Sequence, residues 1–282
     1  MATGTGANTG MLTTQRCAGL AAGSNVERVR VFSWLGMAPS FSNVIGPVAV
    51  GFMIDALGFG AGYALLVLMP LTTMVSARQV PVQTPAVAQE VPAGRTSWDL
   101  LRAPGLKRLL VVNWLLSMCW HVHTFAVPVL GHERGYSAST IGLILGAFTL
   151  SVTAVRAAIP LLAHHLRDVH VVRFAMLGTA CVFALYSLAP NAGSMGLCAL
   201  LLGITLGIVQ PMVMTMLHHL TPDERHGEAL ALRSMAINAS STLMPLVFGA
   251  TGAVLGAAAL FWALGAAVGA GSWVARRLGS AR

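Results

Sequence analysis

Residues 194–217 read SMGLCALLLGITLGIVQPMVMTML, an unbroken run without a single charged side chain. A helix of about 20 mostly apolar residues is long enough to cross the hydrocarbon core of a bilayer. The rest of the chain has the same character, since 56% of its 282 residues are hydrophobic, only 9% are charged, and the mean hydropathy is +0.74. Soluble domains do not have this composition. The sequence therefore predicts a membrane protein.

Further apolar windows lie on both sides of this run, separated by charged or Pro/Gly-rich breaks. No alternation of period two competes with them, and a backbone in lipid must satisfy its own hydrogen bonds, which favours helices. We expect an all-α membrane protein, a helical bundle of about eight transmembrane helices. The predicted windows are 34–56, 60–77, 109–131, 139–163, 171–189, 194–217, 234–255 and 257–275.

The basic residues gather on one side of the predicted spans. With the N-terminus inside and eight crossings, all but two of the 17 Lys and Arg residues fall in inside segments; the exceptions are Arg134, in an outside loop, and Arg156, within a span. Positive residues are retained on the cytoplasmic side. We therefore expect a multi-pass protein of the plasma membrane, the inner membrane in a bacterium, with both termini cytoplasmic. This asymmetry also explains the net charge of +8 without a nucleic-acid partner.

The cysteines give no sign of a metal site or a disulfide framework. Cys17, Cys119, Cys181 and Cys198 stand far apart, and the last three lie inside apolar stretches. Such residues are typical of small core positions. We expect no metal and no cofactor.

A Pro-rich stretch, QVPVQTPAVAQEVPAG, lies between the second and third windows and is typical of an extended linker. It divides the chain into parts of unequal size. We expect a cytoplasmic N-terminal segment at 1–33, a two-span remnant of an N-terminal bundle at 34–77, a cytoplasmic linker at 78–108, a six-helix C-terminal bundle at 109–275 and a cytoplasmic tail at 276–282.

An internal repeat relates the first and seventh windows. Both read P-x3-G-x6-G: GPVAVGFMIDALG carries Pro47, Gly51 and Gly58, and MPLVFGATGAVLG carries Pro245, Gly249 and Gly256. The copies lie 198 residues and six helices apart, so both enter the membrane from the same side, as parallel repeats do. If the six-helix unit has an earlier copy at the same offset, about four spans are expected ahead of Met1.

These features resemble the major facilitator superfamily, whose members have two six-helix bundles joined by a cytoplasmic linker. Gly46-Pro47 with Gly51, preceded by Ser42, is similar to the Gly-Pro motif of the family's fifth span, which is associated with antiporters. The resemblance implies that the eight windows correspond to spans five to twelve of an N-terminally truncated member, with an incomplete N-terminal bundle.

Two charged loops extend the resemblance. The stretch VRAAIPLLAHHLRDVHVVR lies at the position of the family's basic-acidic cytoplasmic loop and keeps Arg167, Asp168 and Arg173. The stretch TPDERHGEALALR, with Glu224 and Arg225, is similar to the region between spans ten and eleven of bacterial members.

A polar stripe on the third window is a candidate cavity lining. Asn113, Ser117, His121 and Thr124 share one helix face, and Trp114 and Trp120 border it. The tryptophans could stack on a planar or cationic ligand. The alternative is that His121 and its neighbour His123 hydrogen-bond within the bundle while the tryptophans anchor packing.

Further candidates lie on three other windows. A cation deep in a span implies a partner, so Arg156 could bind an anionic substrate group, pair with a carboxylate, or snorkel to the inside face. Gln210 shares a face with Gly203 and Gly207, which favours close helix contact. Asn238 and Ser241 form a stripe with the proline and glycine of the second repeat copy.

We expect transport of a small molecule by a secondary transporter, with the lipid bilayer and an unknown substrate as partners and proton-coupled efflux as the candidate mode. The windows contain one acid, Asp55, near the outside end of its span, so a proton would be carried by a histidine such as His121 or by a group in the missing spans. The alternative is a non-transporting truncated membrane remnant or a misassigned gene start. Hydrolase signatures such as HEXXH and GxSxG are absent, so we expect no enzyme.

Overall fold

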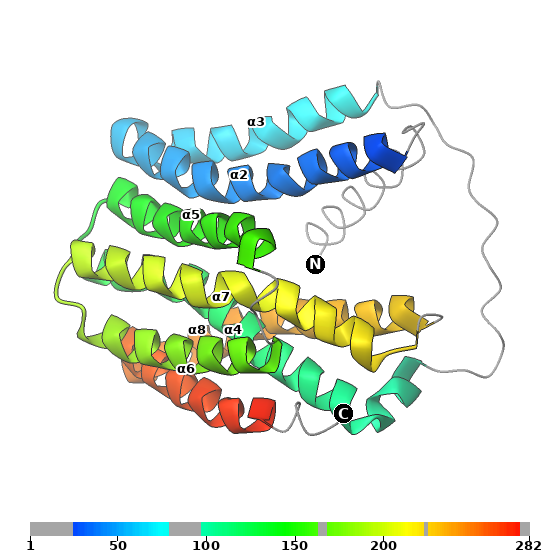
Figure 1. The fold of residues 1–282 in the computed structure, drawn as a ribbon. Helices are drawn as coiled ribbons and strands as arrows, with labels where there is room; N and C mark the ends of the chain where they lie inside the picture. The colour runs from blue at the N-terminus through cyan, green and yellow to red at the C-terminus, as the bar shows by residue number, and fades with distance from the viewer. Residues whose placement is uncertain (1–24, 79–96, 163–167, 223–224, 277–282) are drawn as a thin grey trace.

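The computed structural model describes residues 25–78, 97–162, 168–222 and 225–276. Within them, long helices follow one another and no strand is present, which confirms the all-α prediction. Figure 1 shows the helices stacked side by side, from α3 and α2 through α5 and α7 to α6, α4 and α8. The elements are α2 (Asn25–Leu57), α3 (Phe59–Ala77), the 3-10 helix η1 (Ser97–Arg102), α4 (Pro104–Glu133), α5 (Ala138–Leu162), α6 (Asp168–Leu188), α7 (Ala192–Leu220) and α8 (His226–Arg276).

The second glycine of each P-x3-G-x6-G copy has the same backbone role. Gly58, with φ 82°, separates α2 from α3, and Gly256, with φ 78° and ψ 159°, breaks α8 into two helical segments. Side chains disfavour positive φ, so glycine is the residue that permits these breaks at low cost. The spacing seen in the sequence therefore marks equivalent breaks between consecutive helices.

The helices have the lengths and composition that a bilayer requires. Five helical segments in the described residues are long and apolar enough to cross it, and shorter apolar helices cover Phe41–Leu57 and Phe59–Thr72. The predicted window 234–255 includes positions whose side chains lie outside the described set, so the count of eight stays a prediction. The five segments are Pro104–Glu133, Ala138–Ile159, Val169–Leu188, Ala192–Leu217 and Ala258–Arg276.

Large apolar side chains cover the outer surface of the helices. Tyr63 and Met69 on α3, Phe174 on α6 and Leu246 on α8 are all more than 60% exposed. Such density of exposed apolar groups is unfavourable in water but suits the acyl chains of lipid. The outer surface therefore fits a multi-pass membrane protein.

Helix α5 approaches α2 closely because glycines face the contact. A Cβ on Gly142 would collide with the backbone carbonyl of Pro47, and one on Gly51 would lie 2.5 Å from the carbonyl oxygen of Ala138. Gly146, one turn beyond Gly142, faces the Val48 side chain. This is the small-residue packing by which membrane helices bring their backbones together.

A hydrogen bond across this contact compensates for the proline of α2. Pro47 has no N–H, so the carbonyl of Asn43, four residues earlier, loses its helical donor. The Thr149 hydroxyl on α5 donates to that carbonyl at 2.9 Å. At the far end, the Asp55 carboxylate accepts the backbone N–H groups of Ala138 and Ser139 at 2.9 and 2.7 Å, which caps α5. The single acid noted in the predicted windows thus has a structural role.

The opposite face of α5 packs on α7 in the same way. A Cβ on Gly203 would lie 2.5 Å from the Phe148 carbonyl oxygen, and Gly207 faces the Val152 backbone. The Ser151 hydroxyl donates to the Leu200 carbonyl at 2.8 Å. Helix α5 is therefore held between α2 and α7 by backbone proximity on both sides.

The remaining helices enclose an apolar core. Helix α6 packs on α7 and α8, and α4 packs on α8, around fully buried side chains that include Phe183, Tyr186 and Phe261. The Tyr186 and Phe261 rings are stacked with centroids 5.1 Å apart. Helix α2 reaches this body through α5.

Part of the predicted organisation lies outside the described residues, and the repeat glycines Gly51 and Gly249 differ in their surroundings. Residues 1–24, most of the linker and the tail from 277 lie outside the described residues, so the predicted division into five parts stays a prediction. In the second repeat copy, Pro245 and Gly249 are exposed, and a Cβ on Gly249 would meet open space where its counterpart Gly51 is packed.

We predict that Gly142→Ala destabilises the protein, because the added methyl group meets the Pro47 backbone and cannot be accommodated by a rotamer change. Overpacking of this kind costs about 1–3 kcal/mol. The measurement is the thermal unfolding temperature of the purified chain in detergent. Gly196→Ala on α7 is the matched control, since a Cβ there meets nothing within 4 Å. Equal unfolding temperatures for both variants and the wild type would contradict the close α2–α5 contact.

Candidate substrate cavity

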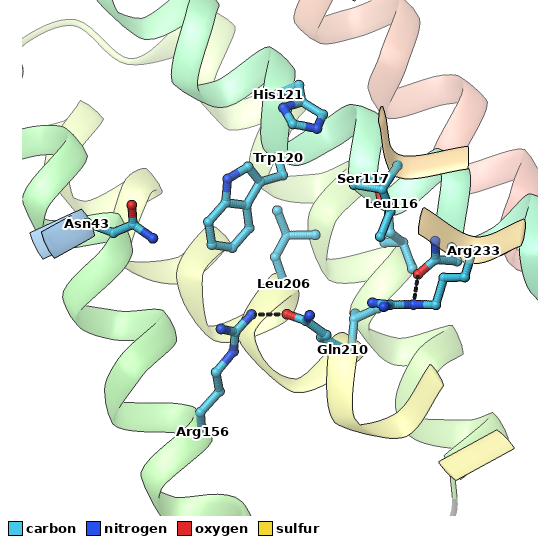
Figure 2. Close-up of a pocket in the computed structure, with 12 residues that line it drawn as sticks. Asn43, Leu116, Ser117, Trp120, His121, Arg156, Leu206, Gln210 and Arg233 are labelled. Carbon is cyan, nitrogen blue, oxygen red and sulfur yellow. Dashed lines mark hydrogen bonds between the residues drawn. The ribbon is translucent and has the colours of Figure 1, made fainter. Parts of the chain in front are cut away.

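A cavity of about 280 Å³ lies where α2, α4, α5, α7 and α8 meet. Its walls combine amides, two guanidinium groups, an indole, an imidazole and aliphatic side chains. The lining residues are Asn43, Asn113, Leu116, Ser117, Trp120, His121, Arg156, Leu206, Val209, Gln210, Arg233 and Ile237. Figure 2 shows nine of them labelled around the space.

The polar groups meet because neighbouring helices run in opposite directions. Asn113 and Arg233 lie in the first halves of α4 and α8, whereas Arg156 and Gln210 lie in the second halves of α5 and α7. All four therefore lie toward the end of the bundle at which α4 and α8 begin. Trp120 and His121 lie farther along α4, nearer the middle of the bundle.

Arg156 reaches across the cavity from α5 to α7. Its Nη2 donates to Gln210 Oε1 at 2.6 Å, and its guanidinium carbon lies 6.0 Å from the centre of the Trp120 ring (Figure 2). Its Nε is buried and has no hydrogen-bond partner among the described residues. Of the alternatives left open by the sequence, pairing with a carboxylate is not what the structure has, since the partner is a neutral amide.

Arg233 forms a second guanidinium–amide pair. Its Nε donates to Asn113 Oδ1 at 3.2 Å, and the two residues are 8% and 4% exposed. The Asn113 Nδ2 is buried and, within the described part of the chain, unpartnered. The bond joins α4 to α8 beside the cavity.

No carboxylate lines this space in the described residues, so its charge is positive. Asp55 caps α5, and Glu228 pairs with Arg225 at 2.6 Å where α8 begins. That hydrogen bond raises the pKa of Arg225. A membrane-buried cation costs at least about 2.5 kcal/mol on insertion scales, and an amide partner does not neutralise it. The cavity is therefore suited to a group that brings negative charge.

His121 and His123, two residues apart on α4, lie in different environments. His121 lines the cavity, whereas His123 is fully buried and lies 3.0 Å through Nε2 from the Tyr186 hydroxyl. His123 also packs on Phe148, whose ring centre lies 4.7 Å from that of Trp120 in an edge-to-face arrangement. The core histidine and Phe148 thus fix the position of the indole in the cavity wall.

The structure brings six of the predicted cavity residues together: Asn113, Ser117, Trp120, His121, Arg156 and Gln210. The other four do not line this cavity. Thr124 donates to the backbone carbonyls of Trp120 and His121, Ser241 donates to the carbonyl of Asn238, Asn238 is exposed, and Trp114 is half-buried.

The loop and motif residues lie elsewhere. Arg173 and Arg225 are at the starts of α6 and α8. Arg167, Glu224 and the Asp168 side chain lie outside the described residues. In the first repeat copy Ser42 is exposed and Gly46 has open space beside it.

Sequence reasoning misses Asn43, Arg233 and the aliphatic wall. The window 234–255 leaves Arg233 in an inside loop, because that residue directly precedes it, but α8 already begins at His226. The spacing of four between Arg233 and Ile237, which also lines the cavity, is the signal that could place both on the same helix face. Asn43 directly follows Ser42, the residue that belongs to the Gly-Pro motif, and no pattern in the sequence marks it.

Comparison with known proteins agrees with this architecture. The fold and cavity are those of a helical membrane protein with a polar space between its helices. The family model described as the Major Facilitator Superfamily matches residues 1–202 and 109–280, and the chain belongs to this family. The chain is similar in fold to a structure described as that of a bacterial metal transporter, with a TM-score of 0.64 and 18% identity over 92% of this chain and 67% of that one. No curated protein sequence matches the chain.

We predict that the cavity holds water, so Ser117→Cys reacts with a charged methanethiosulfonate reagent. The background replaces the four native cysteines by alanine, and the readout is the mass of the labelled protein in permeabilised vesicles. Ile204→Cys is the control, because Ile204 is 50% exposed on the outer surface of α7 and does not line the cavity. Labelling of Ile204→Cys but not Ser117→Cys would contradict a hydrated cavity.

Proposed function

We propose that the chain is a secondary transporter that binds a small molecule in the cavity lined by Arg156, Gln210, Asn113 and Arg233. The observation that carries this proposal is the meeting of paired polar groups from four helices at one space inside an otherwise apolar bundle. Polar groups at membrane depth are costly, and they mark substrate pathways in membrane proteins.

Transport requires the cavity to open to each side in turn. The glycine contacts bring the backbones of α2 and α5 close together, and alternating access in such transporters is largely a rigid-body rocking of one bundle against the other. Asn43 on α2 faces the residues of α4, α5 and α8 across the cavity. We propose that relative motion of α2 and the other helices changes access to this space.

We also propose the orientation that the basic residues favour, with both termini cytoplasmic. In this orientation the ends at which α4 and α8 begin face the cytoplasm, and the two guanidinium–amide pairs lie in the cytoplasmic half of the bilayer. The cavity would then collect substrate from the cytoplasm, which supports efflux.

Protons are the proposed coupling ion, and His121 is the proposed carrier. Histidine has a usual pKa of about 6.5, so it exchanges protons in the physiological range. Arg156 and Arg233 line the same cavity from α5 and α8, and the acids of the described residues lie elsewhere. A protonated His121 would add a third positive charge to the cavity. The charge of a bound substrate would therefore change how readily His121 takes up a proton.

A metal ion is the second candidate substrate, because the similar fold is that of a protein described as a metal transporter. A sequence identity of 18% supports a similar fold and does not extend to the substrate. Divalent metals bind carboxylates, imidazoles or thiolates, and a metal ion beside two guanidinium groups would be repelled. No group of three or more metal-binding side chains occurs in the described residues. We therefore favour a substrate other than a metal ion.

An untargeted transport assay tests the proposal, because it lets the protein select its substrate from a mixture. Proteoliposomes containing the full chain are incubated with a bacterial metabolite extract, washed and analysed by mass spectrometry. We expect at least one metabolite to accumulate relative to empty liposomes, and Arg156→Ala to lower its initial rate about tenfold or more, since a charge-assisted hydrogen bond is lost.

Arg102→Ala is the matched control for this experiment. The Arg102 side chain is 87% exposed on η1 and lies outside the cavity, so its loss should leave the rate unchanged. Accumulation of no metabolite above empty liposomes would favour the alternative of a non-transporting membrane protein.

The pH dependence of accumulation tests the coupling role of His121. We expect the wild-type rate to change as the pH falls below neutrality, and His121→Gln to flatten this change because its amide does not titrate. Rates are measured on the metabolite identified above. An unaltered pH profile in His121→Gln would exclude this histidine as the proton carrier.

A further inference from the structure

We infer that the molecule carried in this cavity is a small amphipathic organic anion, with its anionic group between Arg156 and Arg233 and its apolar body against Trp120. The inference rests on the proposed function, since it names the substrate class of the same cavity.

The charge of the lining residues favours an anionic ligand. Two guanidinium groups, from α5 and α8, face one space, and the hydrogen-bond partners that they have there are the neutral amides of Gln210 and Asn113. Arginine remains charged at any physiological pH. An anionic ligand is therefore the partner that balances the cavity, whereas a cationic ligand would add to its positive charge.

The hydrogen-bonding groups point the same way. The Arg156 Nε and the Asn113 Nδ2 are both buried donors without a partner in the described residues. Buried donors without acceptors are costly, and a carboxylate offers two oxygens that can accept several N–H groups. The unpartnered groups of the cavity wall are hydrogen-bond donors, so a ligand with several hydrogen-bond acceptors fits it.

The rest of the lining selects the body of the ligand. Leu116, Leu206, Val209 and Ile237 present aliphatic surface, and Trp120 presents an indole held in place by Phe148. Apolar surface of this kind favours a hydrocarbon or aromatic body over an inorganic ion with its hydration shell. At about 280 Å³ the cavity is at the small end of ligand sites, so the body is of the size of a single ring.

Three ligands of nearly identical shape separate charge from size. Benzoate, benzamide and benzamidine are an anion, a neutral amide and a cation on the same ring. We expect benzoate at millimolar concentration to raise the thermal unfolding temperature of the purified full chain, while benzamide and benzamidine leave it unchanged. Inorganic phosphate tests the apolar body, and we expect it to give a smaller shift than benzoate.

Variants assign the effect to the two arginines. Arg156→Gln and Arg233→Gln should each weaken the apparent benzoate affinity about tenfold or more, and Arg102→Gln should leave it unchanged. Each shift is measured against the same variant without ligand, so a loss of intrinsic stability does not enter. Arg156→Lys, which keeps the charge, should retain part of the affinity.

The inference is overturned if benzamide or benzamidine stabilises the chain as strongly as benzoate, if phosphate matches benzoate, or if Arg156→Gln and Arg233→Gln bind benzoate as the wild type does. These outcomes are distinct from failure of the proposed function. If the proteoliposomes accumulate a neutral or cationic metabolite, the proposal of transport holds and the proposal of an anionic substrate fails. If benzoate binds but no metabolite accumulates, the preference for an anion holds and the proposal of transport fails.

Discussion

The close contact of α5 with its two neighbours is the constraint on which the rest of the structure depends. Glycines at 142 and 146 bring α5 against α2, and glycines at 203 and 207 bring α7 against the other side. In lipid there is little hydrophobic gain from joining two apolar helices, so close backbone packing and interhelical hydrogen bonds supply the association. Because α5 is held between them, Arg156 reaches Gln210 on α7 while Asn43 of α2 faces the same cavity.

Two features of the contact connect local sequence to the site. Pro47 deprives the Asn43 carbonyl of its helical donor, and Thr149 of α5 supplies another at 2.9 Å. The side chain of Asn43 then lies in the cavity wall. The Gly46-Pro47 pair thus lies where α2 meets both its packing partner and the cavity. The positive charge of that cavity arises from Arg156 and Arg233, each bonded to an amide rather than to an acid.

Much of the fold could be predicted from the sequence because the bilayer imposes simple requirements. The all-α character, the absence of strands in the described residues and the family are predicted from the apolar windows and the sequence motifs. The second glycines of the P-x3-G-x6-G repeat, Gly58 and Gly256, both have positive φ. Of the stripe expected on α4, Asn113, Ser117 and His121 line the same cavity, because helical periodicity places them on one face, and their role in substrate binding stays a prediction. Thr124 lies at the margin of that face, and its hydroxyl bonds back to its own helix. Arg233 and Asn43 could not be found in this way, because their roles depend on which helices become neighbours.

If the cavity holds an organic anion, an aromatic carboxylate that carries a photoreactive group should label its walls. The purified protein is irradiated with 4-azidobenzoate and the modified residues are mapped by mass spectrometry. We expect labels on cavity residues of α4 and α7, such as Trp120 and Val209, that are suppressed by excess benzoate and not by benzamide. Labels confined to exposed residues of α3, such as Tyr63 and Met74, and unaffected by benzoate would contradict this expectation.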